Sequence, residues 1–223
     1  MPAGRQGPSL AYDRSRRTLV MYGGVLDPNS TMDHQTWTMD VIDLPRPPAT
    51  AYLRGSTNPS TLFLSSAPPA TAIAKYSDSS GIRFAGGNAW TAIGTWTADP
   101  VLASGLVTTL KPLQTWIGLK NSDDQGTRFD LRAEVFKNGA PIGAGEARCI
   151  EGVTRNADLA KAVSVAFTPI SPVSFNGSTD VLSVRILTRI GTDTGGSFCG
   201  GHSSAVGLRL YYDSTQRNSN LGF

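Results

Sequence analysis

The strongest constraint on the fold is the run 128–135, in which charged and apolar residues alternate without a break. Successive side chains of a strand point to opposite faces, so this run makes one apolar face and one charged face. A helix would scatter the same charges around its axis. Asn138-Gly139 suits a tight two-residue turn, which predicts an antiparallel return strand over Ile142–Ile150.

Similar patterns recur along the rest of the chain, and 24 glycines and 14 prolines in 223 residues separate them into short segments. We expect further strands over 61–65, 81–84, 92–97, 105–110, 114–119, 162–167, 181–186 and 206–212. The one helical signal is a single turn over 156–161. The sequence therefore predicts an all-β fold, an antiparallel β-sandwich that resembles a jelly roll.

A proline-rich segment, Leu44-Pro-Arg-Pro-Pro48, marks the clearest domain boundary, because proline fixes φ and keeps a linker extended. We expect a first segment over 1–44, a linker over 45–50, the sandwich over 51–215 and a C-terminal tail over 216–223. Residues 1–7 lack the apolar core of a secretion signal, and we expect Met1 to open a fragment of a longer protein.

The first segment carries Ala11-Tyr12-Asp13, a turn, an apolar strand that ends at Gly23-Gly24, and Trp37 about a dozen residues later. Over some 35 residues this order resembles one kelch repeat, which implies a kelch-like β-hairpin segment. It departs from that family at His34-Gln35, where an Asp-Thr pair is more usual. A single repeat cannot bury both of its faces, so it would need further blades or another domain.

Three stretches of the second segment stand out together: Trp116–Leu131, Arg148–Asn156 and Val206–Asp213. Residues 60–213 resemble uncharacterised sandwich domains that recur in multidomain secreted or surface proteins of bacteria. The resemblance implies an extracellular or cell-surface setting and carries no assigned activity. It also favours a disulfide.

The two cysteines are Cys149, at the end of an expected strand, and Cys199, in the glycine-rich loop 192–202. Two lone cysteines in an intracellular protein are usually unpaired apolar residues. A glycine-rich loop has high conformational freedom that a covalent link would restrict, and we therefore expect a Cys149–Cys199 disulfide. Closing a ring of that size would stabilise the fold by roughly 3–4 kcal/mol.

Two groups of residues are candidate ligand sites. Asp123 and Asp124 lie in the turn 121–126 near Asp130, and clustered side-chain oxygens beside a glycine suit Ca²⁺. The same residues also form turns for purely local reasons. The second group is aromatic: Trp90, Trp96, Trp116, Phe136 and Tyr211. These rings serve either as glycan platforms or as packing in the core and between domains.

No catalytic constellation stands out. His202 adjoins Ser203 and Ser204 without a nucleophile elbow, and a carboxylate pair drawn from Asp123, Asp124, Glu134 and Glu146 has a simpler explanation as a solvated face. We expect no enzyme. Basic residues are dispersed and the net charge is +3, which argues against nucleic acid. No apolar run approaches the ~18 residues of a membrane span.

The sequence thus favours a non-catalytic recognition module whose partner is a glycan or a neighbouring protein domain. The alternative is a structural subunit of a fibre, appendage or phage-like assembly, which would self-associate through its edge strands. Neither a cofactor nor membrane insertion is expected, with Ca²⁺ the single candidate ion.

Overall fold

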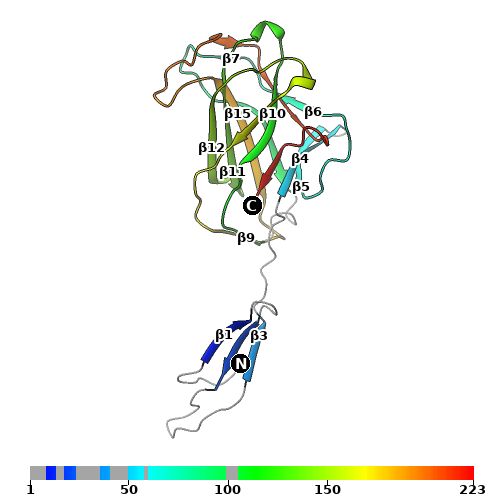
Figure 1. The fold of residues 1–223 in the computed structure, drawn as a ribbon, viewed down its shortest axis with the longest axis vertical. Coiled ribbons are helices and arrows are strands. Elements are labelled where there is room, and N and C mark those ends of the chain that lie inside the picture. Colours follow the sequence, from blue (N-terminus) through cyan, green and yellow to red (C-terminus); the bar gives the residue numbers. More distant parts are fainter. Residues whose placement is uncertain (1–8, 14–17, 24–35, 41–49, 58–59, 99–104) are drawn as a thin grey trace. The chain divides into compact units, whose positions relative to one another are not determined.

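The computed structural model describes residues 9–13, 18–23, 36–40, 50–57, 60–98 and 105–223. The chain divides into two compact units, 1–44 and 45–223, each drawn in Figure 1. The division falls at the proline-rich segment. Thr50 already belongs to a strand of the second unit, one residue before the expected start of the sandwich.

The first unit is a three-stranded antiparallel sheet of β1 (Ser9–Asp13), β2 (Thr18–Tyr22) and β3 (Thr36–Asp40), in that order. β1 and β2 form the expected hairpin, and β3 adds a third strand that the sequence did not predict. Gly23, with φ of 67°, follows β2 in a backbone conformation that favours glycine. Gly24, His34 and Gln35 of the kelch-like pattern lie outside the described residues.

The second unit is an antiparallel β-sandwich. Its strands are β4 (Thr50–Thr57), β5 (Ser60–Ser65), β6 (Lys75–Asp78), β7 (Ile82–Arg83), β8 (Thr91–Ala98), β9 (Gly105–Val107), β10 (Leu113–Leu119), β11 (Phe129–Lys137), β12 (Ala140–Ile150), β13 (Lys161–Val165), β14 (Val173–Phe175), β15 (Leu182–Ile190), β16 (Ser204–Ala205), β17 (Leu208–Tyr212) and β18 (Asn220–Gly222). Two 3₁₀ turns, η2 (Ser122–Asp124) and η3 (Ala157–Leu159), interrupt them.

The main sheet runs β12-β11-β15-β8-β5-β4-β18-β10-β17-β6, and β13 also pairs with β10. It curls into two layers, so that β11 and β15 face β10 and β17 across one core (Figure 1). Two small sheets, β14-β9 and β16-β7, complete the unit. The expected antiparallel sandwich is confirmed, with one exception: β5 meets β8 in parallel at Phe63 and Leu64.

The core takes the apolar residues that the alternation predicts. The following side chains of β11, β10 and β17 are buried in it: Phe129, Leu131, Ala133, Val135, Leu113, Ile117, Leu119, Leu208 and Leu210. At about 25 cal/mol per Å² of buried apolar surface, this burial is the main stabilising term of the fold. The Asn138-Gly139 turn joins β11 to β12 with φ of 49° and 79°, as a tight two-residue turn requires.

The C-terminal residues differ from the sequence prediction. Residues 216–223 are not a tail, because β18 pairs with β4 and touches β10 in the main sheet. Leu221 is completely buried. A three-residue strand is too short to show alternation by itself, and β18 is held in place by its pairing with β4 and β10. Strands β4, β6 and β14 were likewise not predicted, whereas η3 and its capping residue Asn156 were.

The outer edge of β12 is partly covered. Gly145 forms a bridge with Phe167, and the Ala144 carbonyl accepts a hydrogen bond from Thr168 N–H at 3.2 Å. A Cβ atom at position 145 would lie 2.1 Å from the Ala166 carbonyl oxygen. Only glycine permits this close approach, which occupies backbone groups that a bare edge strand would present.

Candidate functional site

The outer face of β12, β11 and β15 gathers charged side chains from three neighbouring strands. Arg132 and Glu134 alternate with the core residues of β11 and so point outward. Arg132 lies opposite Glu146 of β12, and Glu134 lies opposite Arg185 of β15. With Arg148 these residues form a surface that we call the ladder face: Arg132, Glu134, Glu146, Arg148 and Arg185.

Ion pairs link the ladder face from strand to strand. Glu134 Oε2 accepts from Arg185 Nε at 2.8 Å and Nη2 at 2.6 Å, while Glu134 Oε1 lies 2.9 Å from Arg132 Nε. Glu146 Oε2 lies 2.6 Å from Arg148 Nη2, and Glu146 Oε1 lies 3.6 Å from Arg132 Nη1. Each carboxylate is therefore shared between two guanidinium groups.

Two aromatic rings border the ladder face, and arginines lie over both. The Trp90 ring, just before β8, has Arg189 Cζ 4.3 Å and Arg132 Cζ 5.8 Å from its centroid. Arg185 Cζ lies 5.0 Å from the centroid of Phe136. A guanidinium over a ring is attracted to the negative face of the ring, so these contacts fix the orientation of the arginines.

A hollow of about 400 Å³ opens on this face. Its lining comprises Arg132, Glu134, Phe136, Pro141, Gly143, Ala144 and Arg185. Its volume lies within the ~300–1,000 Å³ range of small-ligand sites. One ring, two hydrogen-bond donor groups and one acceptor group thus meet in one depression.

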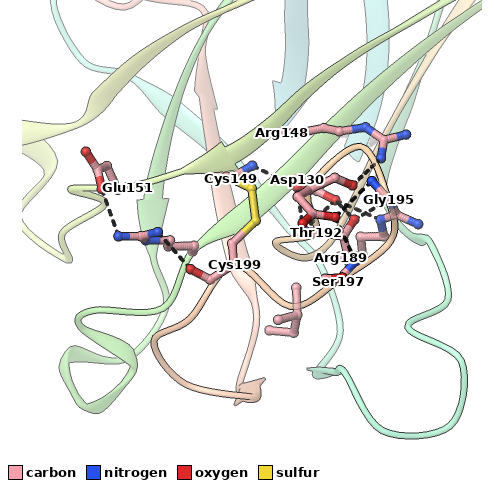
Figure 2. Close-up of a disulfide and its surroundings, with 12 residues drawn as sticks. Asp130, Arg148, Cys149, Glu151, Arg189, Thr192, Gly195, Ser197 and Cys199 are labelled. Carbon is pink, nitrogen blue, oxygen red and sulfur yellow. Dashed lines mark hydrogen bonds and ion pairs between the residues drawn. A yellow bond between two sulfur atoms is a disulfide. The ribbon is translucent and has the colours of Figure 1, made fainter.

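Asp130 precedes the ladder-face residues of β11, and Figure 2 shows it beside Thr192 and Arg189 near the disulfide. It is fully buried, and its Oδ2 atom lies 2.9 Å from Arg189 Nε and 2.6 Å from Thr192 Oγ1. The backbone N–H groups of Cys149 and Thr192 also donate to this carboxylate, at 2.9 and 3.1 Å. Backbone donors and a cation together compensate for the burial of the charge.

The disulfide between Cys149 and Cys199 is present, with the two Cα atoms 5.8 Å apart. It fastens the loop that follows β15 to the end of β12 (Figure 2). Arg128 Nη1 donates to the Cys199 carbonyl at 2.7 Å, and Arg148 Nη1 donates to the Asp193 carbonyl at 2.8 Å. This loop covers Asp130, which explains why an outward-pointing carboxylate is buried.

The proposed calcium ligands are not brought together. Asp130 is occupied by Arg189 and Thr192, Asp124 accepts from Val206 N–H at 3.0 Å, and Asp123 is exposed. Within the described ranges no three His, Cys, Asp or Glu side chains cluster in a way that could hold a metal ion. The turn has a local cause instead, since Asn121 Oδ1 accepts from Asp123 N–H and begins η2.

The five aromatic candidates separate into three environments. Trp90 and Phe136 border the ladder face, as described above. Trp96 belongs to the core: it is fully buried and meets Tyr212 edge-on at 5.4 Å. A β-bulge causes this, because Ala92 and Gly94 pair with adjacent residues of β15 and Ile93 is the extra residue.

Trp116 and Tyr211 lie on the outer face of the opposite layer, where Tyr76, Tyr211 and Trp116 are neighbours across β6, β17 and β10. Tyr211 points outward, as its phase predicts, yet it is only 3% exposed. Its ring lies over Gly118, where an added Cβ would be 2.8 Å from Tyr211 Cε2 and 3.2 Å from the Thr154 carbonyl. Tyr211 is therefore a packing residue and not an open platform.

His202 and Ser203 are exposed just before β16, and Ser204 is exposed in β16; among the described residues no side chain bonds the His202 ring. Glu134 and Glu146 are both paired with arginine. The residues that sequence reasoning missed are Arg148, Arg185 and Arg189. The outward position of Arg185 between Val184 and Ile186 is a signal that could have found it.

None of the helices in the described residues is long and apolar enough to cross a membrane.

No family model matches the chain, and no curated protein does so. Several solved structures are similar to the chain, and two of them match it at low TM-scores. One is the insecticidal delta-endotoxin Cry8Ea1 from Bacillus thuringiensis, at 10% identity and a TM-score of 0.30, over 96% of this chain and 41% of that one. The other is infectious bursal disease virus, Gx strain, at 15% identity and a TM-score of 0.31, over 91% and 42%. The chain thus spans less than half the length of each.

Proposed function

We propose that the sandwich is a non-catalytic recognition module and that the ladder face binds a glycan. The observation that carries this proposal is the hollow in which Phe136, Glu134, Arg132 and Arg185 meet. Sugar hydroxyls both donate and accept hydrogen bonds, and a guanidinium beside a carboxylate offers both partners. The apolar face of a sugar packs on an aromatic ring, for which Phe136 is available.

The test is a titration of the full chain with cell-wall polysaccharides and a glycan array. We expect binding at millimolar sugar or below, and a loss of about 1–2 kcal/mol of binding energy in Phe136→Ala. Phe63→Ala is the matched control, because Phe63 is a partly exposed phenylalanine of β5 outside the ladder face. Absence of binding to every glycan would refute the proposal.

We also propose that the module works outside the cytoplasm as part of a larger surface or secreted protein. The Cys149–Cys199 disulfide supports this setting, because such bonds persist in oxidising compartments. The kelch resemblance of the first unit fits a multidomain protein. Trapping free thiols in cells would test the location: the native protein should resist alkylation unless it is first reduced.

Assembly through edge strands has less support. Phe167 and Thr168 already occupy part of the β12 edge. Light scattering separates the two functions: an independent binding module stays the same size at every concentration, whereas a structural subunit grows.

A further inference from the structure

The ladder face holds more positive than negative charge. Three guanidinium groups, Arg132, Arg148 and Arg185, share two carboxylates, Glu134 and Glu146. We propose that the ladder-face hollow binds an acidic saccharide, with a uronate carboxylate held between Arg132 and Arg185. This inference rests on the proposed glycan-binding function and names the class of glycan.

Glu134 shows how these arginines receive a carboxylate. Arg185 Nε and Nη2 donate hydrogen bonds to Glu134 Oε2, whereas Arg132 Nε forms an ion pair with Glu134 Oε1 at 2.9 Å without a hydrogen bond. Within the described part of the chain, neither Arg185 Nη1 nor Arg132 Nη2 makes a hydrogen bond. Both residues line the hollow, so donors remain for a second carboxylate.

The mixed character of the hollow favours a sugar acid over a simple anion. Glu134 repels a ligand that carries only negative charge, but it accepts hydrogen bonds from hydroxyl groups. A uronate ring offers hydroxyl groups to Glu134, a carboxylate to the arginines and C–H groups to Phe136. The remaining lining, Pro141, Gly143 and Ala144, is small and apolar and leaves space for a ring.

The probes are polygalacturonate, its methyl ester and dextran sulfate, each titrated calorimetrically into the full chain. The ester keeps the sugar ring and hydroxyl groups but lacks the charge. We expect polygalacturonate to bind at least about tenfold more tightly than the ester, with the difference shrinking as salt rises. Dextran sulfate tests whether sulfate supplies the anion instead.

Arg185→Met should weaken polygalacturonate binding about 5- to 10-fold, a modest effect because Arg185 is partly exposed to solvent. Arg185→Lys keeps the charge but loses the planar fork and should recover only part of the affinity. The matched control is Arg209→Met, which removes one charge beside Asp78 on the opposite layer. It should change binding less than twofold.

Four results would overturn the inference. Equal binding of the ester and the acid would show that the carboxylate is not recognised, but it would leave the glycan-binding function intact. Tighter, Arg185-dependent binding of dextran sulfate assigns the anion to sulfate. Equal losses in Arg185→Met and Arg209→Met reduce the effect to net charge. No binding to any polysaccharide refutes the proposed function itself.

Discussion

The two layers of the sandwich share one core but have different outer faces. On β12, β11 and β15, ion pairs and arginine–ring contacts join the strands, and Arg185 and Phe136 border a hollow. On β6, β17 and β10, Arg209 also pairs with Asp78 and lies over Tyr76, but the Tyr211 ring, whose centroid is 6.2 Å from that of Tyr76, is covered. Alternation sets the direction of a side chain, whereas overlying loops set its exposure.

The disulfide fastens the loop 191–199 to the end of β12, and removal of this bond should have the largest effect. Changing Cys149 and Cys199 to serine frees a ring with a sequence separation of 50. We expect a loss of about 4 kcal/mol in urea unfolding. Hydrogen exchange through local opening should rise most in 191–199 and at the Cys149 amide.

Reduced wild-type protein serves as the control and should match the double variant. A loss below about 1 kcal/mol, or no larger increase of exchange in 191–199 than in the rest of the sandwich, would contradict this role of the disulfide.

Truncation of the two outward-facing rings should sharpen the contrast between the faces. Tyr211→Ala leaves a cavity beside Gly118 and should cost about 3 kcal/mol of stability. Phe136→Ala, on the half-buried ring of the ladder face, should cost about 1 kcal/mol. Urea denaturation measures both values. Equal losses would mean that both rings are packing residues.

Asp130→Asn tests the buried carboxylate beside Arg189. It leaves Arg189, whose side chain is 17% exposed, without its carboxylate partner. We expect a loss of about 2 kcal/mol, below the range for fully buried pairs because solvent reaches Arg189. Asp123→Asn, in the exposed turn, should change stability by less than about 0.5 kcal/mol. Added Ca²⁺ should stabilise neither protein; a shift in melting temperature would revive the calcium site.

The smallest expected effects are changes in the pH dependence of stability, one at acid pH and one at alkaline pH. The backbone N–H of Asn176, followed by Lys137 and Asn138, lowers the pKa of Asp180 to about 2. Because this folded-state pKa lies below the ordinary value of 3.8, its contribution is complete above about pH 4 and is lost as pH falls through 2. Asp180→Asn should flatten stability over that window.

Tyr212 affects stability at alkaline pH. Burial, and then the neighbouring Asp213, raises the pKa of Tyr212 above its ordinary value of 10.0. The neutral phenol is favoured in the folded state, so this contribution is complete below pH 10 and is lost as pH rises above it. Tyr212→Phe should reduce the alkaline slope and leave the pH dependence at acid pH unchanged.

Much of the fold follows from local patterns. The alternation in β11 and β15, the Asn138-Gly139 turn and the capped turn at Asn156 are set by neighbouring residues, and the structure confirms them. Strands β6 and β18 are short, and they form by pairing with strands that lie far away in the chain. No local pattern specifies such pairing.

The candidate site was less predictable than the fold. The bulge at Ile93 shifts the alternation of β8, so the burial of Trp96 cannot be read from its own strand. Asp130 has the outward phase of a solvated residue, but the loop 191–199 covers it. Arg185 meets Glu134 only because β15 lies beside β11, a neighbour that is 51 positions away in the chain.

The pairing of β4 with β18 places Thr50 directly opposite Gly222, so the sandwich is entered and left through adjacent strands of one sheet. A short peptide bridge would join these positions, and a new chain start could be opened at the exposed Asn138-Gly139 turn. The domain is therefore suited to circular permutation. For the same reason it could be grafted into a surface loop of an unrelated host protein, with both junctions at neighbouring points.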